Sequence, residues 1–263
     1  MAVRTRHRDQ AAVSASSVAG GLGSRRAARA RARSQGVLRQ RLAATCVAAV
    51  LAACSSTPPP PDWQMNAKTS LERATAAYLT GNSRIEAVEF ARARADLART
   101  GWADLLARAE LTRCAARVAS LEFDDCPGFA ALAQDAPAAE HAYARYLAGK
   151  ATAADAALLP AAHREVLAGS ASADALRRMP DPLARLVAIG VLLRSGRAEP
   201  AMFALAADTA ASQGWSRPLL AWLNAQAQRA ETAGEVEEVA RLRRRIRLVS
   251  EGGPLQASQP AAK

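Results

Sequence analysis

Aromatic side chains are scarce in this chain of 263 residues, at 4% of the total. β-branched residues are also few, whereas alanine makes up about a quarter of the sequence, well above ordinary usage. Strands favour β-branched and aromatic residues, and alanine is the best helix former. The composition therefore argues against an all-β fold and favours helices.

Residues that carry catalytic chemistry are few as well. The chain has three histidines, and it lacks a nucleophile elbow, a phosphate-cradling glycine loop and a His-Glu-x-x-His zinc helix. His141 and His163 are expected on polar helix surfaces, far in sequence from the cysteines, so we expect neither a metal nor a cofactor. Asp124 and Asp125 are adjacent, which suits capping of a helix from Pro127 better than acid–base work. We therefore expect no enzyme activity.

Positive charge is concentrated at the N-terminus rather than in the body. The formal charge is +11, of which residues 1–41, with ten arginines and one aspartate, carry +9. Residues 42–53 carry no charge, so 11 − 9 leaves +2 for residues 54–263. Binding to nucleic acid needs positive charge clustered on the folded surface. The one such cluster, which nearby glutamates offset, is formed by Arg241, Arg243, Arg244, Arg245 and Arg247. We expect no nucleic-acid partner.

A short apolar run has the layout of an export signal. Residues 42–53 follow Arg39 and Arg41 and form a stretch of about 12 residues, whereas a membrane span needs roughly 20. The end of this run, Leu51-Ala52-Ala53-Cys54, resembles the lipobox of bacterial lipoproteins. That resemblance implies cleavage before Cys54 and acylation of this cysteine, and Ser55 after it implies the outer membrane. We expect a lipid-anchored protein that faces the periplasm.

These signals predict the organisation of the chain. Residues 37–53 form the signal peptide, residues 54–66 a Ser/Pro-rich tether, residues 67–250 a helical domain and residues 251–263 a disordered tail. Residues 1–36 are an Arg-rich extension with two open interpretations. Either translation really begins near Val37, or the extension is a long, disordered n-region of the signal.

Glycines divide the body into predicted helices. The expected breaks are Gly81, Gly101, Gly149, Gly169, Gly196, Gly214 and Gly234. Ser83 to Glu86 has the pattern of a capping box. Leu183, Leu186, Val187 and Val191 form an apolar helical stripe on which Gly190 is expected as a point of close contact.

Part of the body resembles tetratricopeptide repeats, in which a small residue follows a marker glycine five positions later. Gly196 and Ala201 have this spacing, and Gly234 and Ala240 approach it. The resemblance implies an all-α fold of antiparallel hairpins stacked as an α-solenoid. A compact orthogonal helical bundle is the alternative.

Two cysteines remain in the body once Cys46 and Cys54 are assigned to the signal and the lipid. An exported protein meets an oxidising compartment, so Cys114 and Cys126 are expected to form a structural disulfide. Two buried free thiols are the alternative.

Tryptophans are the remaining candidates for binding. Trp63 is expected to dock on the first helix or at a membrane interface, and Trp102 to pack in the core. Trp215, Arg217 and Trp222 are the candidate residues for a protein partner, with core packing as the alternative for the tryptophans.

The predicted function is that of a protein-binding scaffold or envelope assembly accessory. The alternative is a peptidoglycan enzyme or a regulator of one.

Overall fold

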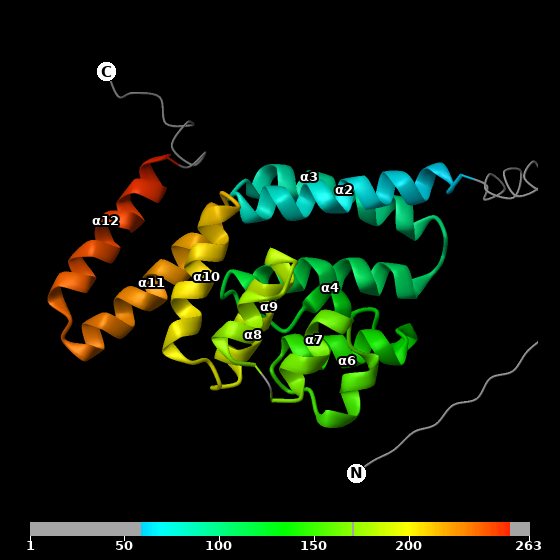
Figure 1. The fold of residues 1–263 in the computed structure, drawn as a ribbon. Coiled ribbons are helices and arrows are strands. Elements are labelled where there is room, and N and C mark those ends of the chain that lie inside the picture. The colour runs from blue at the N-terminus through cyan, green and yellow to red at the C-terminus, as the bar shows by residue number, and fades with distance from the viewer. Residues whose placement is uncertain (1–58, 170, 253–263) are drawn as a thin grey trace, which may run out of the picture. The chain divides into compact units, whose positions relative to one another are not determined.

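The computed structural model describes residues 59–169 and 171–252, and every regular element in them is a helix (Figure 1). The all-α prediction is confirmed. The longer helices are α2 (Asp62–Leu79), α3 (Ser83–Ala98), α4 (Ala103–Ala119), α6 (Ala138–Leu147), α9 (Pro182–Arg194), α10 (Pro200–Ser212), α11 (Ser216–Ala233) and α12 (Val236–Gly252). Short helices fill the middle of the chain: α5 (Pro127–Ala130), η2 (Ala133–Asp135), η3 (Ala153–Leu158), α7 (Ala161–Leu167) and α8 (Ala173–Arg177).

The first helix begins earlier than the sequence suggests. Pro61 is extended, with φ −56° and ψ 145°, and α2 starts at Asp62, inside the predicted tether 54–66. An acidic residue in the first turn favours this start because it complements the helix dipole. The last helix likewise runs to Gly252, two residues beyond the predicted end of the helical domain.

The glycine positions predict the helix breaks correctly, whereas the predicted N-terminal cap of α3 is wrong. All seven glycines expected as breaks have positive φ, as at Gly234, where φ is 74° after α11. The predicted capping box is wrong, because Asn82 is the N-cap of α3 and accepts a hydrogen bond from the Ile85 amide at 3.1 Å. Glu86 is buried instead and forms an ion pair with Arg113.

Helices paired with their chain neighbours form both ends of the folded part, and the middle is irregular (Figure 1). At one end α2 packs on α3; at the other, α10, α11 and α12 follow one another as antiparallel neighbours. Between them the short helices from Pro127 to Arg177 surround α4 and α9. Prolines begin α5 and α9, where they are tolerated because the first amides of a helix have no partner within it.

Helices α4 and α9 meet at the point of close contact that the sequence predicts. A Cβ atom placed on Gly190 would lie 2.4 Å from the backbone oxygen of Val118, so only glycine permits this approach. Around the contact, Val118, Leu186 and Ile189 are fully buried. The main core cluster extends from here through α10 and α11.

Candidate functional site

A disulfide closes the turn that follows α4. The structure joins Cys114, inside α4, to Cys126, just before α5, with their Cα atoms 5.7 Å apart. The predicted pairing is therefore present. Both Leu121 and Cys126 have positive φ, a conformation that side chains other than glycine rarely adopt. The bond thus holds a loop whose backbone is tightly constrained.

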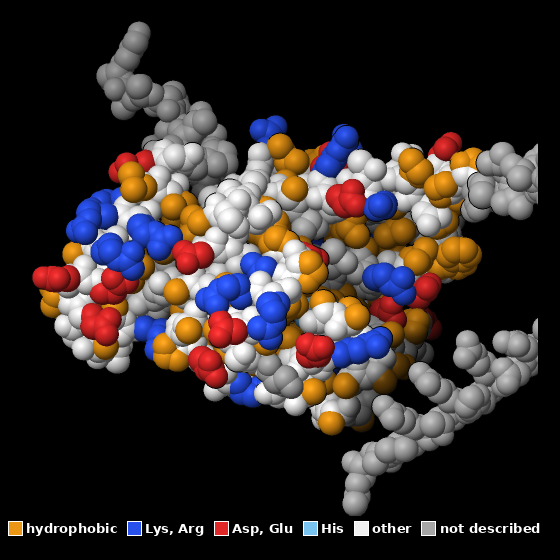
Figure 2. Space-filling model, in the orientation of Figure 1, with side chains coloured by type: hydrophobic (Ala, Val, Ile, Leu, Met, Phe, Trp, Pro, Cys, Tyr) orange, Lys and Arg blue, Asp and Glu red, His pale blue; other side chains and the backbone are white. Residues whose placement is uncertain are grey.

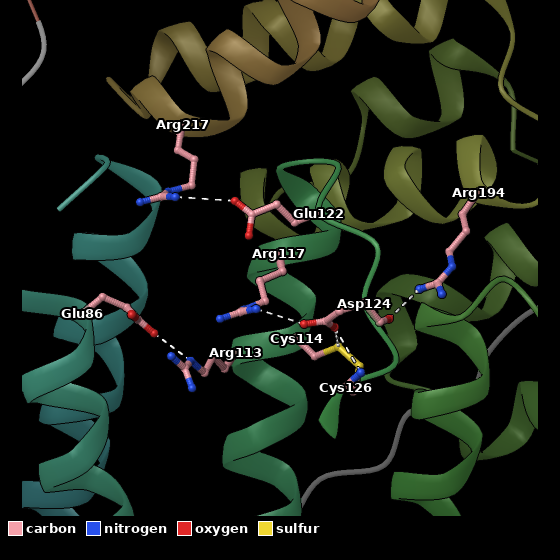
Figure 3. Close-up of polar contacts among 9 residues, drawn as sticks. All are labelled: Glu86, Arg113, Cys114, Arg117, Glu122, Asp124, Cys126, Arg194 and Arg217. Atoms are coloured by element: carbon pink, nitrogen blue, oxygen red, sulfur yellow. Dashed lines mark hydrogen bonds and ion pairs between the residues drawn. A yellow bond between two sulfur atoms is a disulfide. The ribbon is translucent and has the colours of Figure 1, made fainter. Parts of the chain in front are cut away.

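Arginines from three helices hold the same loop (Figure 3). Arg117 of α4 pairs with the Asp124 carboxylate at 2.9 Å, and Arg217 of α11 lies 3.5 Å from Glu122. Arg194 of α9 donates to the backbone oxygen of Asp124 at 3.2 Å. The loop therefore connects α4, α9 and α11.

The sulfur atoms and the Asp124 carboxylate lie close enough together to suggest a metal site. Their donor atoms are all within 4.8 Å of one another. A disulfide offers no thiolate, however, and one Asp124 oxygen already accepts from the Cys126 amide at 3.0 Å while the other pairs with Arg117. In this form the cluster stabilises the turn between α4 and α5. Asp124 thus braces the turn before α5 instead of capping the helix, which corrects the capping prediction.

The predicted partner residues Trp215, Arg217 and Trp222 do not share an open surface. Trp222 is fully buried, its indole donates to the Ala119 oxygen at 3.0 Å, and its ring meets Phe203 edge-on. The partner prediction is therefore wrong for Trp222, because the face it occupies on α11 is covered.

The other two residues of the set join α11 to α2. Trp215 is half-buried against the cluster that contains Tyr78. Arg217 covers the Tyr78 ring at 4.4 Å and donates to the Tyr78 backbone oxygen at 2.7 Å. Their contacts are structural.

The two histidines of the folded part differ in their surroundings. His163 is buried, not on a polar surface as predicted, and its Nδ1 lies 3.1 Å from the Tyr146 hydroxyl. Burial lowers the pKa of His163 to about 4, so the ring is neutral at pH 7. His141 is half-buried, and its Nε2 lies 2.8 Å from the Ala133 oxygen.

An apolar groove is a candidate binding feature that sequence reasoning missed. It has a volume of about 440 Å³ and runs between α2 and the start of α4, with Trp63, Ala67, Leu71, Leu97, Trp102 and Leu105 in its lining. Figure 2 shows hydrophobic side chains gathered between the N-terminal end of α2 and α4. The Trp63 and Trp102 rings meet edge-on, with centroids 6.1 Å apart. Trp102 is 57% exposed, so its predicted core position is wrong.

A second cavity of about 440 Å³ lies beside the groove and shares Arg108 with it. Glu140 lines this cavity and accepts from Arg108 at 2.8 Å, so its charge is already compensated. The same holds for the five buried carboxylates of the described ranges, each of which pairs with an arginine: Glu86, Glu89, Glu110, Glu140 and Asp155. Hydrogen bonds from Arg145 hold the pKa of Asp155 at about 2.

The predicted lipidation site, Cys54, lies outside the residues that the structure describes. None of the helices between residues 59 and 252 combines the length and the apolar character that crossing a bilayer requires. Comparison with protein-family models, curated proteins and solved structures finds no match to this chain.

Removing the disulfide should destabilise the fold without abolishing it. For the double substitution Cys114→Ala/Cys126→Ala we expect a loss of about 3 kcal/mol in the free energy of unfolding, since the bond closes a short loop. Urea unfolding measures the loss, and wild-type protein in reducing agent should match the variant. Recovery of both cysteines as free thiols by non-reducing peptide mapping would remove the basis of this prediction.

The buried histidine should make stability depend on pH. The pKa of His163 rises from about 4 in the folded state to roughly 6.5 on unfolding, so protons bind preferentially to the unfolded chain. Between pH 7 and pH 5 we expect stability to fall by about 2 kcal/mol from this group. His163→Gln should flatten this slope in urea titrations, whereas His141→Gln should retain it. Equal slopes in both variants would contradict the assignment.

Proposed function

We propose that this chain is a lipoprotein anchored at Cys54 in the outer membrane, facing the periplasm, and that it binds an envelope protein as a scaffold or assembly accessory. The anchor rests on Leu51-Ala52-Ala53-Cys54 and the charged and apolar segments before it. The binding role rests on the helical body, and above all on the outer face of α12.

Helix α12 is the last helix that the structure describes, and it is covered on one side. Val239 and Leu242 are buried toward the preceding helices, whereas Val236 and Leu248 are 76% and 70% exposed. Large exposed apolar side chains on a terminal helix face are typical of interaction surfaces when they lie together with arginine.

The arginines of α12 divide into two groups. Arg241, Arg243 and Arg245 pair with Glu238, Glu231 and Asp208. Arg244 and Arg247 are exposed and have no acidic partner in the parts of the chain that the structure describes. Figure 2 shows basic side chains gathered over α12.

Helical spacing places Arg244, Arg247 and Leu248 on one face, three and four residues apart. We call these three residues the α12 patch. Its chemistry fits a partner that presents carboxylates around an apolar contact.

The buried carboxylates support the same interpretation. Glu89 pairs with Arg92 of its own helix, whereas the other four pair with an arginine of another helix and so hold the helices in place. A scaffold needs such rigidity, because a preorganised surface binds with less loss of entropy.

Substitution of the lipidated cysteine tests the anchor. Cys54→Ala should abolish labelling by radioactive palmitate and should shift the protein from the membrane fraction to the soluble or unprocessed fraction, since the acylated sulfur is lost. Cys46→Ala is the matched control and should keep the label. Persistent labelling of Cys54→Ala would falsify the anchor.

Charge reversal in the α12 patch tests the binding role. From detergent-solubilised envelopes the wild type should recover a protein partner in stoichiometric amount. Arg244→Glu/Arg247→Glu should reduce this recovery about tenfold or more, because like charges then oppose each other. The control Arg73→Glu/Arg84→Glu makes the same change in net charge at exposed positions of α2 and α3. Equal recovery in both variants, or no stoichiometric partner for the wild type, would contradict the proposal.

A further inference from the structure

The Trp63–Trp102 pair separates an apolar surface from a polar one. On one side lies the groove, with Ala67, Leu71 and Leu105 in its lining. On the other side lies an open hollow of about 600 Å³ with Asp62, Asn66, Arg99 and Thr100 around the same two indoles. Tryptophan prefers this position between apolar and wet surroundings, as it does at the headgroup level of a bilayer.

The rim of the groove has the same mixed character. Lys68 and Arg108 line it, and both side chains are long enough to lay their methylenes along apolar surface while the charges stay in water. Their acidic partners, Glu72 and Glu140, lie on α2 and α6, so no net charge of either sign dominates the rim. A strongly charged partner therefore gains little at this site, whereas a neutral apolar one fits.

The chain's covalent geometry places this end near any membrane that holds Cys54. Asp62, where α2 begins, is eight positions after Cys54 in the chain. Even a fully extended chain of that length spans no more than about 28 Å. Pro61, the residue before α2, itself lines the groove. The groove and the anchor are thus within reach of one bilayer surface.

We propose that this edge of the molecule is a lipid-contact site: Trp63 and Trp102 lie at the headgroup level of the anchoring bilayer, and a phospholipid acyl chain enters the apolar groove. The inference rests on the lipid anchor proposed above. The occupant is a lipid of the bilayer, because a tether of this length keeps the groove within about 28 Å of the surface that holds Cys54.

Quenching of tryptophan fluorescence by brominated phospholipid tests the site. The full-length acylated protein is reconstituted into phosphatidylcholine vesicles that contain dibromo-phosphatidylcholine, and flotation is measured on the same sample. The wild type should float and show quenching relative to vesicles without bromine. Trp102→Phe should lose roughly half of that quenching, since Trp63 remains at the interface.

The matched control is Trp215→Phe, which removes a half-buried tryptophan at the other end of α2. It should keep the wild-type quenching. A protein that floats but shows no quenching, or equal quenching in Trp102→Phe and Trp215→Phe, overturns the lipid site and leaves the groove to a protein partner. A wild type that does not float overturns the anchor itself, and the lipid site with it.

Discussion

Close approach of helices α4 and α9 is the constraint on which the described fold depends. Gly190 makes it possible, since any side chain there would meet the backbone of Val118. Alanine has little side chain to bury, so a chain rich in alanine gains dispersion energy chiefly by bringing helix backbones together. The hairpin α2–α3, the short helices and the α10–α11 pair all pack around this centre.

Arginine pairs supply what the small core residues cannot. Glu86, Glu110 and Glu140 are buried, yet their arginines reach them from other helices or other turns of the chain. Such pairs add little net stability because desolvation opposes the attraction between the charges. These pairs do penalise any arrangement that separates the two charged partners. Helices that pack through alanine can slide past one another at little cost, so the ion pairs define the register between them.

Local chemistry made the fold class, the seven glycine breaks and the cysteine pair predictable, because each depends on residues near in sequence. The surroundings of the tryptophans were not predictable in this way. Trp222 and Trp102 look alike in sequence, each beside an apolar helical stripe. Helix α10 helps to bury Trp222, whereas Trp63 of α2 meets Trp102 edge-on and leaves it exposed. Periodicity identifies the apolar face of a helix without saying which neighbour reaches it. The prediction of the α3 cap was wrong for a related reason, since Glu86 forms an ion pair with Arg113 of another helix.

The folded part has two chemically different ends, and α2 sets the distance between them. Its eighteen residues span about 27 Å. The tryptophan groove lies at its start, while Ser216 and Arg217 of α11 bind backbone oxygens at its end. Helix α12 packs on α11 (Figure 1). Under the proposed lipid contact, the bilayer would lie at the start of α2 and the arginine-bearing face of α12 beyond the other end of this helix (Figure 1). Lipid contact and protein binding would then use separate surfaces, so the protein could engage both at once.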